Sequence, residues 1–582
     1  MKPFDLKSDL IEVQNFYKQV IEEILASNPE ALELLKSLSV INTEVETNID
    51  KESIETCCEI SDIEKFLKEL LDTYIIKKKE GKKELYEFSY QEIKVFLATL
   101  TDETHHKKAL HYYEKKIQKV KANLYDEIEV LYHKSKVNPS EELVNEFLTI
   151  ANRIEQFEYE HTRLIDIAQE LFILEDKYKA PILIVVGNIL SAIGNSEDAE
   201  KIYLNALEIY EKLAKQYYRI YLPYVAATQK SLGTLYTDLK RFEEAEKIYS
   251  EALNSYKELE RQYYNIHSPE FHLKVYDGLE KSYLDDLKAY NELLKQYYGI
   301  YLPEKHSIEG DFGNIHIDLD LLEDIQDGTI DSIESYKTLA KMSYDMYLMD
   351  IAKTQSNLGL IYSELRKFED AERMHLESLR IKRKIADHYP YQVLPELVLT
   401  LLDLGDFYAT LNKFEDAEPM FMEALNISKQ LAAQNPEIYL HNVAIIQNSL
   451  GKVYTRLRKL EDAEKMYIDA LKIFKGLARE APKTYLYNVA DVQNNLGNLF
   501  LILKDFKKAE SFLNKANKSD PANIDVLYNL ACLESLKNNH AKALELLKKA
   551  IELNKNYADR AKSDDKFENV KDLEEFKKLV GE

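Results

Sequence analysis

The sequence predicts an all-α protein in which helix pairs stack into a solenoid, with a small α+β domain at its amino-terminal end. Three observations lead to this fold class. The 582 residues include only 15 Gly and 13 Pro, which is few for a protein built from sheets and turns. One pattern of small and aromatic residues recurs along most of the chain. Before about residue 100 this pattern is absent, and a short hairpin-like segment stands there instead.

The recurring pattern is clearest in the segment NSLGKVYTRLRKLEDAEKMYIDAL. Counted from Gly451, tyrosines follow after 3 and 16 residues and alanines after 12 and 19 residues. Small residues at these positions let two antiparallel helices approach closely, and the large residues fill the gaps beside the contact. One helix pair cannot bury this face alone, so neighbouring pairs must stack. The residues that open the units are Gly187, Gly233, Gly359, Gly405, Gly451, Gly497 and Ala531.

This pattern resembles that of the tetratricopeptide repeat over roughly residues 179–557. Most successive glycines are 46 residues apart, whereas the step from Gly497 to Ala531 is the family's usual 34. Twelve additional residues are about three helical turns, so we expect both helices of each pair to be lengthened. The resemblance implies a superhelix of about nine helix pairs.

A tyrosine-rich phrase recurs in the lengthened part, as KQYYRIYLP at Lys215–Pro223 and KQYYGIYLP at Lys295–Pro303. Its counterparts fall at the junctions between helix pairs, which favours a packing role over a ligand-stacking site. The units near 267–333 are degenerate, and the stretch between His306 and Ile333 has eight acidic residues and no Lys or Arg. A calcium loop is the alternative for this stretch, but its spacing lacks the Gly and terminal Glu of an EF-hand loop.

The amino-terminal part predicts a helix, a β-hairpin and a second helix in SDIEKFLKELLDTYIIKKKEGKKELYEFSYQEIKVFLATL. The hairpin turn is expected at Glu80-Gly81, and two earlier helices are expected at Phe16–Leu25 and Ala31–Leu38. This order resembles the winged-helix part of STAND-type signalling NTPases, whose regulatory halves often continue into tetratricopeptide arrays. The sequence contains no G-x-x-x-x-G-K-[ST] loop, so we do not expect nucleotide binding by that family's mechanism.

Four parts are therefore expected along the chain. They are a winged-helix-like domain at 1–100, a helical connector at 101–178, the repeat array at 179–557 and a capping helix at 558–582. The capping helix would cover the last repeat with a polar face.

Composition narrows the class of protein. The net charge of −25 argues against a nucleic-acid-binding protein. The three cysteines, Cys57, Cys58 and Cys532, indicate neither a disulfide framework nor a zinc site, which favours a cytoplasmic location. No apolar stretch reaches the roughly 18 residues of a membrane span. Lysines on the predicted hairpin are the only candidates for nucleic-acid contact, although edge strands often carry lysine to prevent aggregation: Lys77, Lys78, Lys79, Lys82 and Lys83.

No catalytic motif is present, so we expect a protein that is not an enzyme and needs no cofactor or metal. Three histidines, His105, His106 and His111, lie on one expected helix. His106 and His111 are five residues apart rather than four, and no carboxylate or cysteine pattern completes a metal site.

The expected binding surface is the inner face of the array, which is built from the first helix of each pair. Asn448, Lys452 and Arg456 follow one another at intervals of four residues, so they lie on one helical stripe. Asn494 and Asn498 occupy the matching positions in the next unit. Asparagine can bond both polar groups of a peptide backbone, and paired Lys and Arg can hold a carboxylate. These five residues are the predicted peptide-binding site. The recurring glutamines Gln229, Gln355, Gln447 and Gln493 are interpreted as inter-helix structure.

The sequence thus favours a cytoplasmic scaffold that binds a protein or peptide partner. One alternative is the sensor half of a split STAND-type system that acts with a separate NTPase chain. A second alternative is a DNA-binding regulator that uses the hairpin lysines.

Overall fold

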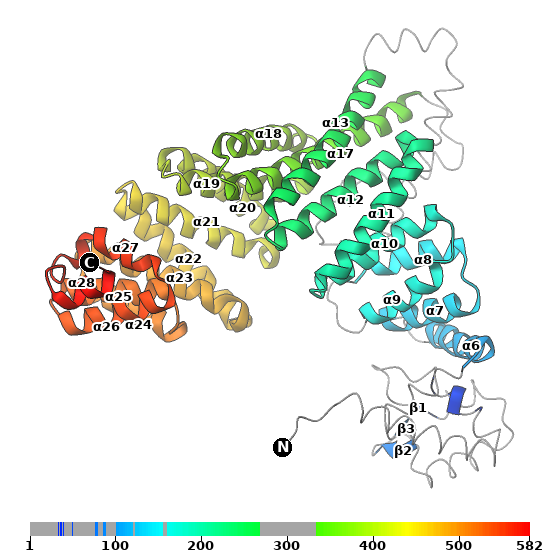
Figure 1. The fold of residues 1–582 in the computed structure, drawn as a ribbon, viewed down its shortest axis with the longest axis horizontal. Coiled ribbons are helices and arrows are strands. Elements are labelled where there is room, and N and C mark those ends of the chain that lie inside the picture. Colours follow the sequence, from blue (N-terminus) through cyan, green and yellow to red (C-terminus); the bar gives the residue numbers. More distant parts are fainter. Residues whose placement is uncertain are drawn as a thin grey trace. The chain divides into compact units, whose positions relative to one another are not determined.

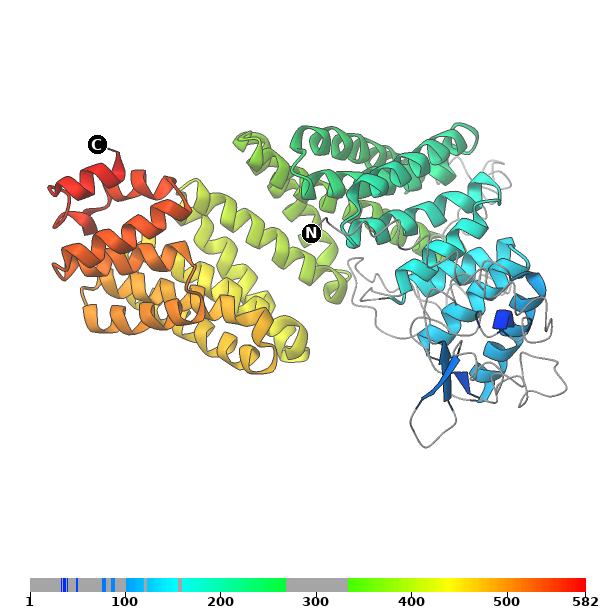
Figure 2. The same ribbon diagram turned by 60° about the horizontal axis from the view of Figure 1, so that its bottom comes forward.

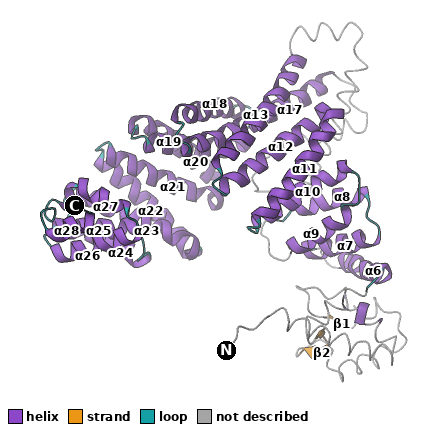
Figure 3. Ribbon diagram, viewed as in Figure 1, coloured by secondary structure: helices purple, strands orange, loops and turns teal. Residues whose placement is uncertain are grey.

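The computed structural model describes residues 101–119, 123–154, 160–267 and 333–581, together with 33, 35–37, 39, 49–50, 76–79 and 85–88. Almost all of the described chain is helical (Figure 3). The chain divides into two compact units, Met1–Phe312 and Gly313–Glu582, and each is described by itself.

In the described part of the first unit, three short strands precede a series of helices. A hydrophobic core joins α7, α8, α9 and α10, and Leu131, Phe147 and Leu164 are fully buried in it. The described helices are α6 (Glu103–Lys119), α7 (Leu124–Val137), α8 (Glu141–Ala151), α9 (Glu160–Leu171), α10 (Asp176–Ala192), α11 (Ser196–Gln216), α12 (Tyr218–Asp238) and α13 (Phe242–His267).

In the second unit, successive helices form antiparallel pairs that stack on one another (Figures 1 and 2). The helices are α17 (Ile333–Glu364), α18 (Phe368–Ala386), α19 (Pro390–Thr410), α20 (Phe414–Gln434), α21 (Pro436–Arg456), α22 (Leu460–Glu480), α23 (Pro482–Ile502), α24 (Phe506–Ser519), α25 (Ile524–Leu536), α26 (His540–Leu553), α27 (Asn556–Ser563) and α28 (Glu574–Val580), with a 3-10 turn, η1, at Asp565–Phe567.

Six helix pairs, from α10–α11 to α23–α24, are held together where a glycine of the first helix meets a large residue of the second. The ring of Tyr467 lies so close to Gly451 that a Cβ atom at residue 451 would be 2.5 Å from it. Phe421 packs in the same way against Gly405, at 2.8 Å. Any side chain larger than hydrogen would push the two helices apart. The structure therefore confirms the physical reason given for the small and aromatic residues of the pattern.

The turn inside six of the described pairs has a conformation that the sequence did not predict. In these six a non-glycine residue with φ between 56° and 62° follows the first helix, and the next N–H bonds back to that helix, whereas the turn between α10 and α11 has Gly194 at φ 80°. In one such turn the N–H of Lys459 donates to the carbonyl of Tyr454 at 2.9 Å. This bond satisfies a carbonyl at the helix end. The left-handed residues are Lys240, Arg366, Asn412, Arg458, Lys504 and Asn538.

The strands near the amino terminus form a sheet with the order β1-β3-β2. Strand β2 (Ile76–Lys79) pairs antiparallel with β3 (Leu85–Phe88), as the predicted hairpin requires, whereas the pairing of β1 (Ile49–Asp50) with β3 was not predicted. The expected turn at Glu80-Gly81 lies outside the described residues, as do most residues of the helices expected around the hairpin.

The predicted composite fold class, a solenoid joined to a winged-helix-like domain, is wrong and is corrected here. The fold class that the structure supports is an all-α solenoid of helix pairs. The strands have two, four and four residues, and a sheet of this size has too little apolar face to form a stable layer of its own. The domain boundaries proposed from the sequence stay predictions, and the degenerate units near 267–333 lie almost entirely outside the described residues.

The carboxy-terminal end differs from the single capping helix expected over 558–582. The chain forms α27, then η1, then α28. Asp564 interrupts the helix because its carboxylate accepts a hydrogen bond from the Lys566 N–H at 3.0 Å. Phe567 and Phe576 then turn into the core that they share with α25. Among the described residues, no helix is both long and apolar enough to cross a membrane.

Candidate functional site

The candidate site lies on the first helices α19, α21 and α23, where neighbouring pairs present equivalent positions. We call the exposed side chains of these helices the first-helix face. Leu399 on α19 and Ile445 on α21 are equivalent residues, and they are 51% and 37% exposed. Lys452 and Arg456 are exposed on α21, and Asn498 is half-buried on α23. The face therefore combines exposed aliphatic side chains with two cations.

Asn448 is part of the packing between helices rather than of this exposed surface. It is only 9% exposed. Its amide N–H donates to Asp491 Oδ2 on α23 at 2.8 Å, and its Oδ1 accepts from the Asn495 amide at 3.0 Å. These bonds join α21 to α23, so both polar groups of the Asn448 amide already have partners inside the protein.

Lys452 shares the same carboxylate. Its Nζ lies 3.3 Å from Asp491 Oδ2, and the Lys452 and Asp491 side chains are 52% and 30% exposed. An ion pair as open to water as this one contributes about 0–1 kcal/mol, so another carboxylate can replace Asp491 at little cost. Arg456 is exposed one turn further along α21 and makes no ion pair with any residue that the structure describes.

Asn494 repeats the behaviour of Asn448 one unit later. It is 5% exposed, and its Oδ1 accepts from the Asn529 amide on α25 at 2.9 Å. Of the five predicted site residues, the structure brings Lys452, Arg456 and Asn498 to the accessible surface and uses Asn448 and Asn494 to join helices. Asp491 and Asn495 were missed. Asp491 could have been found because it stands where Ile445 and Leu399 stand in the preceding units.

Acidic residues lie beside the cations on the first-helix face. Burial raises the pKa of Asp403 on α19 to about 6. Asp406 is exposed on α19. Desolvation by neighbouring groups raises its pKa, and the charge of Lys452 on α21 acts in the opposite direction.

A buried ion pair lies between α18 and α19, close to these carboxylates. Lys382 is 2% exposed, and its Nζ donates to Thr400 Oγ1 at 2.7 Å and lies 3.5 Å from Glu396 Oε2. Burial lowers the pKa of Lys382. Lys353 on α17 holds the other carboxylate oxygen of Glu396 at 3.1 Å. The ammonium group of Lys382 thus has its partners inside the protein and does not reach the exposed surface.

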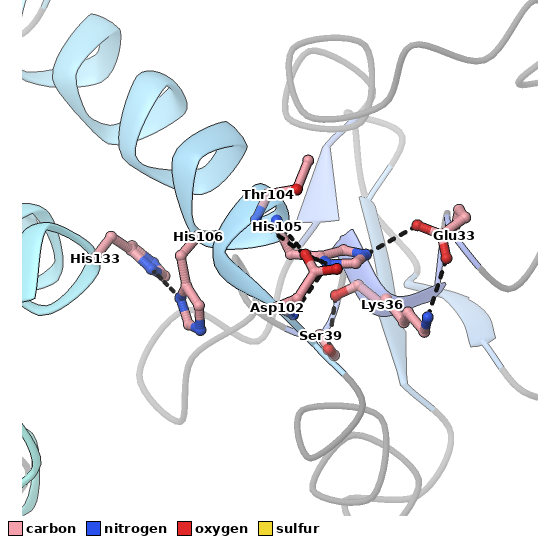
Figure 4. A network of polar contacts seen from close by, with 8 residues as sticks. All are labelled: Glu33, Lys36, Ser39, Asp102, Thr104, His105, His106 and His133. Atoms are coloured by element: carbon pink, nitrogen blue, oxygen red, sulfur yellow. Dashed lines mark hydrogen bonds and ion pairs between the residues drawn. The ribbon is translucent and has the colours of Figure 1, made fainter. Parts of the chain in front are cut away.

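The histidines on α6 take part in two separate networks (Figure 4). His105 Nε2 faces Glu33 Oε2 at 3.0 Å, and its Nδ1 faces Asp102 Oδ1 at 2.7 Å. His106 Nδ1 lies 2.9 Å from His133 Nδ1 on α7. Burial, followed by the charges of Lys136 and Arg163, lowers the pKa of His106 to about 4.

The third histidine of the predicted set, His111, is exposed on α6 and belongs to neither network. Within the described part of the chain, no group of three or more His, Cys, Asp or Glu residues could hold a metal ion. On the hairpin, Lys77, Lys78 and Lys79 lie in β2, whereas Lys82 and Lys83 are outside the described residues.

The recurring glutamines lie between helices, as predicted. Gln229, Gln447 and Gln493 are 6%, 4% and 4% exposed. Gln355 is buried to a similar degree, and its amide donates to Glu377 on the neighbouring helix α18 at 2.6 Å. These positions therefore contribute to packing inside the helix pairs.

Comparison with known proteins agrees with this architecture. Models of the tetratricopeptide repeat match residues 178–258, 350–430, 442–518 and 524–557. No curated protein matches the sequence.

Several solved structures are similar. A STAND protein with a tetratricopeptide repeat sensor, from Pyrococcus horikoshii, is 16% identical with a TM-score of 0.40, and the match covers 93% of this chain and 65% of that protein. BtubC from P. vanneervenii is 24% identical, with a TM-score of 0.30 and coverage of 40% and 91%. YrrB, described as a TPR protein with an unusual peptide-binding site, is 18% identical, with a TM-score of 0.23 and coverage of 35% and 87%.

Proposed function

Because the chain contains tetratricopeptide repeats, we propose that it is a protein-interaction scaffold whose partner binds along the first-helix face through an acidic segment. The observation that carries this proposal is the position of Lys452 and Arg456. Both are exposed on one side of α21, and the only ion pair that either makes within the described chain is the weak one between Lys452 and Asp491.

The chemistry of the face favours a carboxylate in an extended, partly apolar segment. Lys452 and Arg456 are separated by one helical turn, so their donors can converge on one carboxylate. The exposed side chains of Leu399 and Ile445 provide apolar contact for neighbouring residues of the partner. A carboxylate of the partner replaces that of Asp491 at Lys452, and Asn498 adds a half-buried amide on the next helix.

We further propose that the chain acts without catalysis. Among the described residues, the most strongly buried ionisable groups are held in packing contacts. Cys532 is fully buried, burial raises the pKa of its thiol, and its Sγ lies 3.9 Å from Asp564 in the core behind α25. Lys382 is enclosed by Thr400 and Glu396. Neither group is placed to act on a bound partner.

The test measures binding of a fluorescent peptide that carries a carboxy-terminal Glu-Asp pair and two leucines. The Lys452→Ala/Arg456→Ala variant should bind this peptide about 10- to 100-fold more weakly, because it loses charge-assisted hydrogen bonds. Asp491→Asn should bind it about two- to fivefold more tightly, because Lys452 no longer has an internal competitor. If the double variant binds the peptide as wild type does, the proposed site is wrong.

The alternative role, as the sensor half of a split signalling ATPase, stays a prediction that rests on the amino-terminal sequence. Its test is co-purification from the host. A separate chain with a P-loop that purifies with this protein, and is lost when residues 1–100 are removed, would favour it. The cytoplasmic location and the absence of nucleic-acid binding also stay predictions.

A further inference from the structure

The second helices of the second unit carry an exposed aliphatic residue at one repeat position. These residues are Leu376 on α18, Met422 on α20 and Ile468 on α22, and they are 44%, 48% and 47% exposed. Each stands 17 residues after the glycine that opens its unit. Because they share one register in stacked helix pairs, they lie on the same side of the stack.

Cations lie beside these aliphatic side chains, three on α18, one on α20 and three on α22. Positions three before, four after and seven after the aliphatic residue lie on one helical face. No Asp or Glu occupies these positions in α18, α20 or α22, and every residue there is exposed, whereas the position seven before holds an exposed glutamate in each helix, namely Glu369, Glu415 and Glu461. We call the aliphatic residues and these cations the basic stripe. The cations are Arg373, Arg380, Arg383, Lys429, Lys465, Lys472 and Lys475.

Most of these cations are not neutralised by the protein itself. Arg373 pairs with Asp370, and Arg383 Nε donates to Glu423 Oε1 on α20 at 3.1 Å. The remaining five make no ion pair in the part of the chain that the structure describes, namely Arg380, Lys429, Lys465, Lys472 and Lys475. The stripe is therefore a basic surface on a chain whose net charge is −25.

The same register in the first unit lacks this combination. On α11 the aliphatic Leu204 is followed by Glu208 and Glu211 at the positions where α18 and α22 have cations. On α13 the stripe keeps Lys247 and Lys257 but has Ser250 at the aliphatic position. The repeat architecture therefore does not by itself require exposed aliphatic side chains between unpaired cations.

We propose that the basic stripe docks an acidic amphipathic helix of a partner protein. The aliphatic row of such a helix covers Leu376, Met422 and Ile468, and its carboxylates pair with the cations on either side. Neighbouring packed helices are about 10 Å apart, so three second helices span about 20 Å, which an α-helix of about 14 residues covers. This surface belongs to the second helices and is independent of the first-helix face.

The width of the stripe favours a helix over an anionic membrane. Glu377, Glu423 and Asp469 each follow the aliphatic residue directly and border the stripe, where they are half-buried. A flat anionic bilayer would face these carboxylates as well as the cations. A partner helix about 10 Å wide that crosses α18, α20 and α22 covers each of them from the aliphatic residue to the cation seven residues later. A flat bilayer would also meet the exposed Glu369, Glu415 and Glu461 in the first turns of these helices.

The test uses the full chain and a labelled 18-residue helical peptide with leucines on one face and glutamates elsewhere. A scrambled peptide of the same composition and vesicles of phosphatidylserine and phosphatidylcholine are the other probes. We expect the helical peptide to bind at least about fivefold more tightly than the scrambled one. Met422→Ser/Ile468→Ser and Arg380→Glu/Lys472→Glu should each weaken its binding about tenfold, through lost apolar contact and reversed charge respectively.

Two control variants distinguish the basic stripe from a general effect of net charge and from the first-helix face. Lys247→Glu/Lys257→Glu on α13 makes the same change in net charge and should leave the affinity within about twofold. Lys452→Ala/Arg456→Ala should also leave it unchanged, because that variant alters only the first-helix face. Equal binding of the helical peptide by wild type and both stripe variants would overturn the proposal. So would vesicle binding that depends on the stripe without any binding of the helical peptide.

Discussion

Individual polar residues of the first helices have different roles although they lie on one helical stripe. Helical periodicity places Asn448, Lys452 and Arg456 on the same side of α21, as the sequence predicted. It does not reveal that a carboxylate on the next helix, Asp491, is near enough to bond both Asn448 and Lys452. The exposed cations of the candidate site could thus be predicted from one sequence. The role of the buried asparagines could not, because it depends on a residue 43 positions away.

Asn448→Ala should lower stability rather than remove a ligand contact. The substitution removes the two hydrogen bonds that Asn448 makes to Asp491 and to the Asn495 amide, which should cost about 1–2 kcal/mol of the free energy of unfolding. Urea denaturation of the full chain measures this loss. Asn498→Ala is the matched control. Asn498 is half-buried on α23, four residues after Asn494, and its substitution should lower the free energy of unfolding by under about 0.5 kcal/mol. Equal losses in the two variants would contradict the role assigned to Asn448.

Replacing the two partners of the buried ion pair, Lys382 and Glu396, should change the free energy of unfolding in opposite directions. The lowered pKa of Lys382 means that folding disfavours the charged side chain, so its burial as a cation reduces stability below the folded-state pKa. The equivalent residues in the other 46-residue units are Tyr210, Tyr256, Ser428 and Phe474. Lys382→Met should therefore leave stability unchanged or raise it by about 1 kcal/mol, whereas Glu396→Gln should lower it by about 1–3 kcal/mol. Calorimetry of both variants would refute this account if Lys382→Met proved the more harmful.

At the scale of helices and turns, the sequence predicted which helices pair and why, since the contacts of Gly405 and Gly451 follow from residue size. It did not predict the left-handed turn residues, because four of the six are arginine or lysine, which are not signals for positive φ. It also missed the interruption at Asp564, since a single side-chain bond to the backbone decides where α27 ends. Hydrogen bonds between a side chain and the nearby backbone cannot be predicted from the periodicity of hydrophobic residues.

Arg458→Gly tests the turn conformation directly. Arg458 has φ of 61°, a region that costs an L-residue about 1–2 kcal/mol and glycine much less. We expect the substitution to raise the free energy of unfolding by about 0.5–1 kcal/mol, after the greater backbone entropy of glycine in the unfolded chain is subtracted. Lys465→Gly, at an exposed position inside α22, should instead be destabilising by a similar amount. Thermal denaturation that ranks the two variants in the other order would exclude the turn assignment.

The contact between α6 and α7 should weaken on acidification. The pKa of His106 lies below that of an unfolded histidine, so the stability from burying its neutral ring is present above about pH 6.5 and lost as pH falls toward 4. The charges of Lys136, Arg163 and His105 oppose protonation, and that of Glu170 favours it. Protection factors of α6 amides, which take account of the slower intrinsic exchange at lower pH, should fall between pH 7 and pH 5 in wild type and change much less in His106→Gln. The same fall in both proteins would show that other groups are responsible.

At the scale of the whole chain, the described structure is a set of stacked helix pairs that present two different charged surfaces. The first helices offer Lys452 and Arg456 beside the carboxylates of α19, and the second helices of the second unit offer the basic stripe. Cations on exposed helix faces attract an acidic protein segment locally, although the net charge of the chain is −25. This distribution of charge supports a scaffold that gathers protein partners.

The most direct test of this account is the affinity of the acidic, leucine-containing peptide for wild type, Lys452→Ala/Arg456→Ala and Asp491→Asn, measured by fluorescence anisotropy at one salt concentration. The account predicts that the double variant binds about 10- to 100-fold more weakly than wild type and that Asp491→Asn binds more tightly. Equal affinities in all three proteins would contradict it.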